Sequence, residues 1–180
     1  MGEIISLLLF LLAANLDTVM LAMSWGLRQR RFSRKAVFVI AAVTTAATWL
    51  ALALGGWAGS LLAGMLAKRL GGALLLAMGV WMLVDGLREK EDQAPVPASL
   101  AECGALALAL GANNMGMGVG AGLAGLGPEV AALCNFLITI AAMVLGSWLG
   151  HRAGGTWFSR YAPLASGGLL IVLGAVAPWL

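Results

Sequence analysis

The chain has 180 residues, of which 61% are hydrophobic and 11% are charged, and its formal net charge is +3. Soluble domains carry about 25% charged residues, so this composition excludes an ordinary soluble domain and indicates a membrane protein. The basic residues gather between apolar segments and not along one helix face, which argues against a nucleic-acid partner.

Apolar segments predict six helices along the chain, and each is long enough to cross a bilayer. The predicted ranges are 4–26, 36–59, 62–86, 99–123, 129–150 and 162–179. The fold class is therefore an all-α membrane protein with six transmembrane helices. The first segment lacks a basic flank and contains Asp17, so we interpret it as a permanent span and not as a signal peptide. Because the connections are short, we expect consecutive helices to pack as hairpins.

A polar stretch at 88–99 divides the chain almost in half. We predict a first three-helix repeat at 1–90, a polar cytoplasmic linker at 91–98 and a second three-helix repeat at 99–180. The first, third and fifth connections hold five, two and two Lys or Arg residues, and the other side holds only Lys68 and Arg69. Positively charged loops stay in the cytoplasm, so we expect a multi-pass protein of a bacterial-type inner cell membrane with both termini outside.

The two halves resemble each other in sequence. A shift of 96 residues lays Asp17 over Asn113 and Gly26 over Gly122. A shift of 91 residues pairs polar residues of the second and fifth helices, laying Thr44 over Asn135 and Thr48 over Thr139. A repeat with an odd number of spans must insert its two copies in opposite orientations. This inverted repeat is typical of secondary transporters, whose sites lie near the membrane midplane between the repeats.

Asp17 lies near the centre of the first predicted helix. Inserting a charged side chain at this depth in the membrane costs about 2.5–3.5 kcal/mol on insertion scales, so we expect Asp17 to have a specific role. On a helix, Asp17 shares a face with Ala13, Met20 and Ser24 and should point into the bundle. We interpret it as a cation ligand; the alternative is a protonated carboxyl that hydrogen bonds to a neighbouring helix.

Asn113 and Asn114 are the counterparts of this acid in the second half. An amide oxygen can bind a cation without adding charge, and Met117 lies one helical turn further on. Carboxylate, amide oxygen and thioether together suit Mn(II) or Fe(II) better than Mg(II) or Ca(II). The sequence therefore predicts a metal site made of Asp17, Met20, Asn113, Asn114 and Met117.

Five further polar residues are expected to line the ion pathway or to complete the coordination shell. Interhelical hydrogen bonding is the alternative role for these residues, which are Asn15, Thr44, Thr48, Asn135 and Thr139. In the fourth helix, Gly116 with Gly120 and Gly118 with Gly122 form two small-xxx-small pairs, which let a helix approach its neighbours closely.

Three segments resemble a known family across nearly the whole chain. Residues 15–28, Asn-Leu-Asp-Thr-Val-Met-Leu-Ala-Met-Ser-Trp-Gly-Leu-Arg, are similar to the first-helix Asp motif of the MntP-type manganese efflux proteins and their YtaF-type sporulation-associated relatives, in the lysine-exporter superfamily. Residues 70–86 and 167–174 are similar to the third and sixth helices of the family. The family typically repeats the Asp in its fourth helix, where this chain has two asparagines. The Asp role therefore carries over to Asp17 only.

The resemblance and the residues together imply secondary active export of a divalent metal cation, for which Mn(II) is the first candidate. We expect transport to be coupled to protons and to proceed as the two halves rock about a midplane site. We expect no permanently bound cofactor; the partners are the metal ion, protons and the lipid bilayer, with a homodimer left open. The chain has no His cluster, nucleophile triad or phosphate-binding loop, so we do not expect an enzyme. The alternatives are an exporter of another cation or small solute, and a non-transporting membrane scaffold.

Overall fold

The computed structural model describes residues 2–27, 33–87, 99–153 and 156–177, and within them every regular element is a helix. This confirms the all-α prediction, and the predicted linker at 91–98 lies outside the described residues. α6 begins at Thr156 and not at the predicted position 162, because lipid offers a free backbone group no hydrogen-bond partner and favours a continuous helix. The six helices are α1 (Gly2–Leu27), α2 (Arg34–Ser60), α3 (Gly64–Leu87), α4 (Leu100–Leu123), α5 (Pro128–Ala153) and α6 (Thr156–Val176).

Serine and glycine residues set several helix ends. The hydroxyl of Ser33 accepts a hydrogen bond from the backbone N–H of Ala36 at 3.1 Å and so caps the start of α2. Ser99 does the same for α4. α4 ends where Gly125 takes a φ of 100°, a left-handed conformation that glycine adopts without strain.

Four of the six helices are long and apolar enough to cross a membrane. Their candidate spans are Ile4–Gly26, Arg34–Ser60, Gly64–Asp85 and Pro128–Arg152, whereas α4 and α6 contain the shorter apolar stretches Leu100–Ala112 and Leu164–Val176. Many large hydrophobic side chains, including four tryptophans, are exposed on the outside of the bundle. Such a surface suits lipid and not water, which identifies a multi-pass membrane protein.

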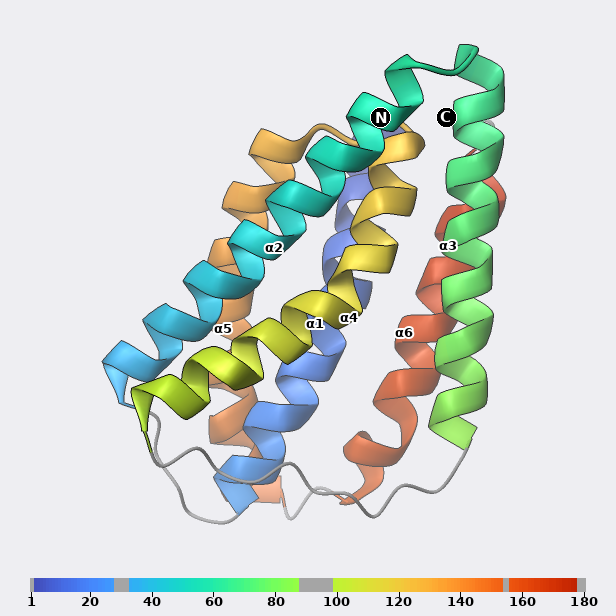
Figure 1. Ribbon diagram of the computed structural model, residues 1–180. Coiled ribbons are helices and arrows are strands. Elements are labelled where there is room, and N and C mark those ends of the chain that lie inside the picture. The colour runs from blue at the N-terminus through green and yellow to red at the C-terminus, as the bar shows by residue number, and fades with distance from the viewer. Residues whose placement is uncertain (1, 28–32, 88–98, 154–155, 178–180) are drawn as a thin grey trace.

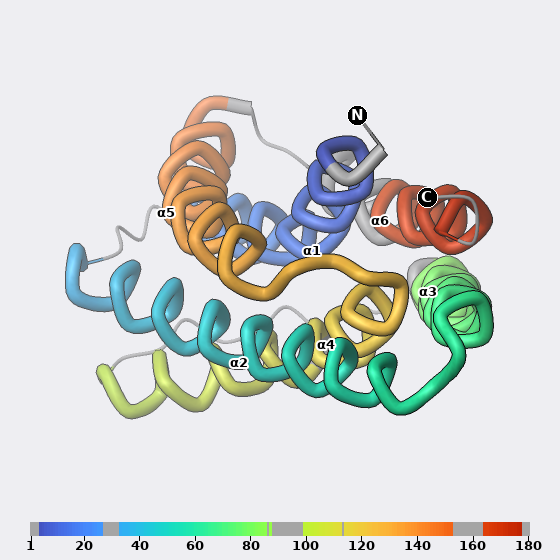
Figure 2. The backbone as a smooth tube through the Cα atoms, turned by 90° about the horizontal axis from the view of Figure 1, so that it is seen from above, coloured from blue at the N-terminus to red at the C-terminus, as the bar shows by residue number. Residues whose placement is uncertain are grey.

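The helices form two layers of three, as Figure 2 shows from one end. In one layer α1 lies between α5 and α6; in the other α4 lies between α2 and α3. The first helix of each predicted half thus lies between the second and third helices of the other half. Both termini lie at the same end of the bundle, together with the short α2–α3 and α4–α5 connections (Figure 1).

The expectation that consecutive helices pack as hairpins is wrong for most of the chain. The most extensive contacts join α2 with α4, α1 with α5 and α3 with α6, and each of these pairs combines helices from different halves. Among consecutive helices in the described residues, α3 and α4 share a moderate contact and α2 and α3 a small one, whereas the other consecutive pairs meet at most marginally. A short connection keeps two helix ends close, but it does not decide which faces pack; in lipid that depends on where small residues let backbones approach.

Glycines bring the helices of these pairs into backbone contact. On the α1·α5 interface a Cβ added to Gly26 would overlap the carbonyl oxygen of Ser147, and on the α2·α4 interface one added to Gly122 would overlap that of Leu52. The two small-xxx-small pairs of α4 face different helices: Gly118 lies against α2, whereas Gly116 and its partner one turn later lie against α3. The prediction of close approach at these glycines is confirmed.

Candidate functional site

Asp17 lies on the central helix α1, at the point where one face of this helix changes from fully buried to half-buried side chains. Phe10 and Ala13, earlier on the same side, are fully buried, whereas Asp17, Met20 and Ser24 are half-buried. Oδ1 of Asp17 accepts a hydrogen bond from the backbone N–H of the next residue, Thr18, at 2.6 Å and lies 3.3 Å from the hydroxyl of Thr18. The carboxylate therefore lies near the middle of the helix, where Thr18 holds one of its oxygens.

Asn114 brings an amide group from α4 to the same part of α1. Its side chain is 2% exposed, and Nδ2 donates a hydrogen bond to the carbonyl oxygen of Ala14 at 3.3 Å. Its Oδ1 atom is buried and accepts no hydrogen bond from any residue that the structure describes. A buried oxygen without a donor is costly, and a cation would satisfy it. Asn113 lies in the same helix, but its side chain is outside the described residues.

The two methionines of the predicted site lie in different surroundings. Met117 is fully buried in an apolar cluster one turn after Asn114, and Met20 is half-buried one turn after Asp17. Across the described ranges, no group of three or more His, Cys, Asp or Glu side chains could hold a metal ion. A metal-binding role for Asp17, Asn114 and the two methionines stays a prediction.

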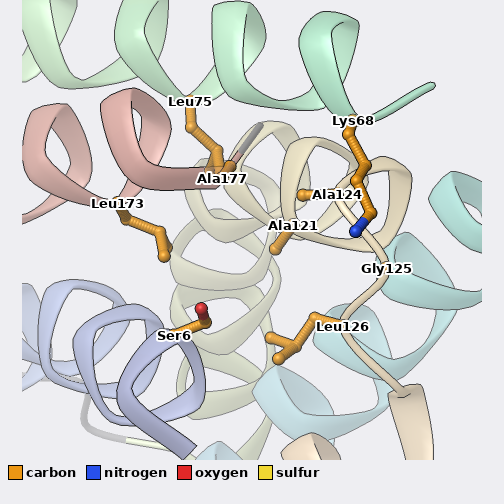
Figure 3. A pocket seen from close by; sticks show the side chains of 9 residues that line it. All are labelled: Ser6, Lys68, Leu75, Ala121, Ala124, Gly125, Leu126, Leu173 and Ala177. Atoms are coloured by element: carbon orange, nitrogen blue, oxygen red, sulfur yellow. The ribbon is translucent and has the colours of Figure 1, made fainter. Parts of the chain in front are cut away.

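A pocket of about 260 Å³ opens at the end of the bundle that holds the termini. Figure 3 shows the side chains around it, with the ammonium group of Lys68 near its rim. The pocket lies between α1, α3, α4 and α6, and it is lined by Ser6, Lys68, Leu75, Ala121, Ala124, Gly125, Leu126, Leu173 and Ala177.

A buried apolar cluster separates this pocket from Asp17. Leu75, Ala121 and Leu173 belong both to the pocket wall and to the cluster, and Phe10 and Leu170 are fully buried within it. Along α1 the order is therefore pocket, cluster and carboxylate. In this structure the path from Asp17 toward the terminal end of the bundle is closed by packed side chains.

Three of the predicted pathway residues form a hydrogen-bond network between α1 and α5, and Nδ2 of Asn135 extends it to the hydroxyl of Thr45 on α2 at 3.4 Å. Nδ2 of Asn15 donates to Oδ1 of Asn135 at 2.9 Å, and the hydroxyl of Thr139 donates to Oδ1 of Asn15 at 2.8 Å. All three side chains are buried. The network joins α1, α5 and α2 here, so a role in lining a pathway stays a prediction.

The other two predicted pathway residues bond within their own helix. The hydroxyl of Thr44 donates to the carbonyl oxygen of Ile40 at 2.8 Å, and that of Thr48 donates to the carbonyl oxygen of Thr44 at 2.9 Å. Both side chains are buried against α4 and its neighbours in the core. Neither hydroxyl donates to another helix through these bonds, and their pathway role also stays a prediction.

Replacing Thr139 with valine should weaken the contact between α1 and α5, because it leaves the amide oxygen of Asn15 without its donor. We expect a loss of about 0.6–1.7 kcal/mol in the free energy of unfolding, the range found for hydrogen bonds between membrane helices. This loss can be measured by unfolding the purified protein in mixed micelles that contain an increasing fraction of denaturing detergent. Thr48→Val is the matched control, since its hydroxyl only duplicates a helical hydrogen bond. Equal losses for both variants would contradict the proposed strength of the network.

Residues of α3 and α6 that the sequence did not single out also face this region. The hydroxyl of Ser166 donates to the carbonyl oxygen of Ala13 at 2.7 Å, and Oγ lies 3.6 Å from Sδ of Met82. A usable signal was present, because Ser166 is the one polar side chain in the apolar stretch Leu164–Val176. It was missed because a lone serine in a membrane helix is more often a packing residue.

Fold and composition together define the class of this protein, which is a multi-pass helical membrane protein with buried polar side chains inside its bundle. Residues 62–177 match the Mntp family, described as "Putative manganese efflux pump". The chain therefore belongs to the family of putative manganese efflux pumps, a family of transporters and not of enzymes.

Individual relatives agree with the family match. The "Putative manganese efflux pump MntP" of Bacillus licheniformis is 30% identical over 180 residues, which covers 96% of this chain and 92% of the relative. The protein of the same description from Corynebacterium glutamicum is 30% identical over 106 residues, or 57% of this chain and 55% of the relative. The "Probable sporulation protein YtaF" of Bacillus subtilis is 28% identical over 91 residues, or 51% of this chain and 43% of the relative. No solved structure matches the chain significantly.

Proposed function

We propose that this chain exports a divalent metal cation, with Mn(II) as the first candidate, by secondary active transport coupled to protons. The observation that carries the proposal is the meeting of α1 and α4 at the middle of the bundle. There the amide of Asn114 bonds to the carbonyl oxygen of Ala14, one helical turn before Asp17, and its buried amide oxygen has no donor among the described residues. The names of the relatives supply the class of substrate.

The arrangement of the helices supports an inverted repeat of six spans, with α1, α2 and α3 related to α4, α5 and α6. The contact of α1 with α5 then corresponds to that of α4 with α2, and the contact of α1 with α6 to that of α4 with α3, as observed. The halves at 1–90 and 99–180 interlock, so we interpret them as repeats and not as separable domains.

Matching glycine contacts support one register for this repeat. Gly26 lies against Ser147 and Gly122 against Leu52, which corresponds to a shift of 96 residues from α1 to α4 and of 95 residues from α2 to α5. The shift of 91 residues read from the sequence differs from the second value by one helical turn. In the register of the glycine contacts, the counterpart of Thr139 is Thr44 and not Thr48.

Alternating access in this arrangement requires the apolar cluster to open. The α1·α5 and α2·α4 interfaces are packed backbone to backbone, and α3 also meets the backbone of α4 at Gly71, whereas side chains fill the space between α1 and α6 around the pocket. We therefore place the movement at the contact of α1 with α6, beside the pocket. This replaces the rocking of intact halves, because interlocked halves cannot move apart as rigid bodies.

The charge distribution supports a direction of transport. Arg34, Lys35 and Arg152 lie at the end of the bundle opposite the termini, so we place that end in the cytoplasm and the pocket outside. Export of two charges against an inside-negative potential costs about 4.6 kcal/mol per 100 mV, which proton exchange would supply. Asp17 would carry either the metal ion or a proton, so metal affinity should fall as pH falls.

Uptake of Mn²⁺ into inverted membrane vesicles tests the proposal. An acidic vesicle interior should accelerate uptake, because protons leave as the metal enters, and a protonophore should remove the acceleration. Vesicles without the protein provide the control. An uptake rate that does not depend on the pH gradient would contradict proton coupling. Uptake of another cation but not of Mn²⁺ would contradict Mn²⁺ as the substrate. If no cation is taken up at all, the result would favour a non-transporting scaffold.

A further inference from the structure

An oxygen and a sulfur atom lie side by side where α6, α3 and α1 meet. Ser166 on α6 is 0% exposed and donates its hydroxyl proton to the carbonyl oxygen of Ala13 at 2.7 Å. Sδ of Met82 on α3 lies 3.6 Å from the same hydroxyl oxygen. A hydroxyl has a single proton, and the shorter bond uses it, so lone pairs on Oγ and Sδ remain for a cation.

The separation of these two atoms fits two neighbouring ligands of one metal ion. Bonds of about 2.1 Å to oxygen and about 2.3 Å to sulfur place two ligand atoms about 3.1–3.6 Å apart, for angles of about 90–109° at the metal. The observed distance of 3.6 Å lies at the upper end of this range. A small inward movement of either side chain would bring both atoms to a bound ion.

This pair lies next to the proposed site, on the side of the apolar cluster. Ala13 precedes Asp17 by one helical turn, a rise of about 6 Å along the same face of α1. Asn114 donates to Ala14, so the amide reaches the same turn of α1 as the hydroxyl of Ser166. Met82 and Ala13 belong to this cluster, so an ion that left Asp17 toward the terminal end of the bundle would meet the sulfur and hydroxyl oxygen where it entered the cluster.

A second thioether of α3 lies one turn before Met82. Gly116 of α4 packs so closely against Met78 that a Cβ added to this glycine would lie 2.9 Å from the methionine sulfur. α3 thus presents two thioethers, four residues apart, to the helices that hold the proposed site. Thioether sulfur binds borderline and soft cations and is a poor ligand for Mg²⁺ or Ca²⁺.

We propose that Ser166 and Met82 are cation ligands of the transport site, and that their oxygen and sulfur atoms select a borderline divalent cation over Mg²⁺ as it passes from Asp17 toward the outer pocket. This inference rests on the proposed function and adds to it the residues that set ion preference. The chemical class of the ligand is a divalent cation with affinity for both oxygen and sulfur, such as Mn²⁺, Fe²⁺ or Cd²⁺.

Isothermal titration of the purified full chain with Mn²⁺, Cd²⁺ and Mg²⁺ tests the inference. Met82→Leu keeps an apolar side chain of similar size but removes sulfur, so the affinity for Mn²⁺ should fall about tenfold and that for Cd²⁺ by at least as much, while that for Mg²⁺ stays unchanged. Ser166→Ala removes an oxygen ligand and should weaken all three ions. Met65→Leu is the matched control, because Met65 is 61% exposed near the start of α3.

The outcomes separate this inference from the proposed function. Wild-type affinities for all three ions in Met82→Leu and Ser166→Ala, together with loss of binding in Asp17→Asn, would overturn the inference alone. Unchanged binding and transport in Asp17→Asn would overturn the proposed function. If size-exclusion chromatography shows that Met82→Leu does not fold, Met82→Gln replaces it; an amide oxygen there should raise affinity for Mg²⁺ relative to Cd²⁺, and an unchanged ratio would contradict the inference.

Discussion

Asp17→Asn should abolish transport of the metal ion. The substitution keeps the size and shape of the side chain but removes the negative charge inside the bundle, and no cluster of acids in the described residues replaces it. Loss of a partner that only supports a metal ligand costs about 10–100-fold in affinity, so loss of a charged ligand should reduce Mn²⁺ uptake by about 100-fold or more. Initial rates of uptake into inverted vesicles, at equal protein content, measure the effect.

Asp85→Asn is the matched control for this result. Asp85 lies near the end of α3 and is half-buried, so the same chemical change is made away from the middle of the bundle. Its uptake rate should stay within about twofold of the natural protein, because the change leaves Asp17 and the middle of the bundle unaltered. If the Asp17→Asn protein retains more than half of the natural uptake rate, the carboxylate of Asp17 is not part of the transport site.

Gly122→Ala should destabilise the whole bundle. The added Cβ would overlap the carbonyl oxygen of Leu52 and lie 2.9 Å from the backbone nitrogen of Gly56, and neither backbone atom can turn away as a side chain would. α2 and α4 would have to move apart along the most extensive helix contact of the molecule. Overpacking of this kind costs about 1–3 kcal/mol, and the thermal midpoint of unfolding in detergent should fall accordingly.

Gly104→Ala provides the control on the same helix. A Cβ added to Gly104 would meet nothing within 4 Å, so the substitution adds only helix propensity. It should leave stability unchanged or raise it by up to about 1 kcal/mol. The comparison isolates the steric cost from the effect of replacing glycine by alanine. If both variants melt at the same temperature, the backbone contact at Gly122 is not what holds α2 against α4.

The sequence by itself determined which parts of the chain are helices and that they belong in a membrane. Runs of apolar residues must satisfy their backbone groups within a helix when lipid surrounds them, so segment boundaries follow from composition. Asp17 also stood out without a structure, because an acid in such a run needs a reason to be there. The glycine pairs of α4 likewise indicated close helix contacts before their partners were known.

Only the tertiary structure decided which helices pack together and which polar atoms meet. Lipid tails are as apolar as leucine, so the sequence carries little signal for which face of a membrane helix is buried against which neighbour. For this reason most of the hairpin packing was predicted wrongly, and the contact between Ser166 and Met82 was missed. Residues more than eighty positions apart are joined there by side-chain geometry, which no local pattern along the chain records.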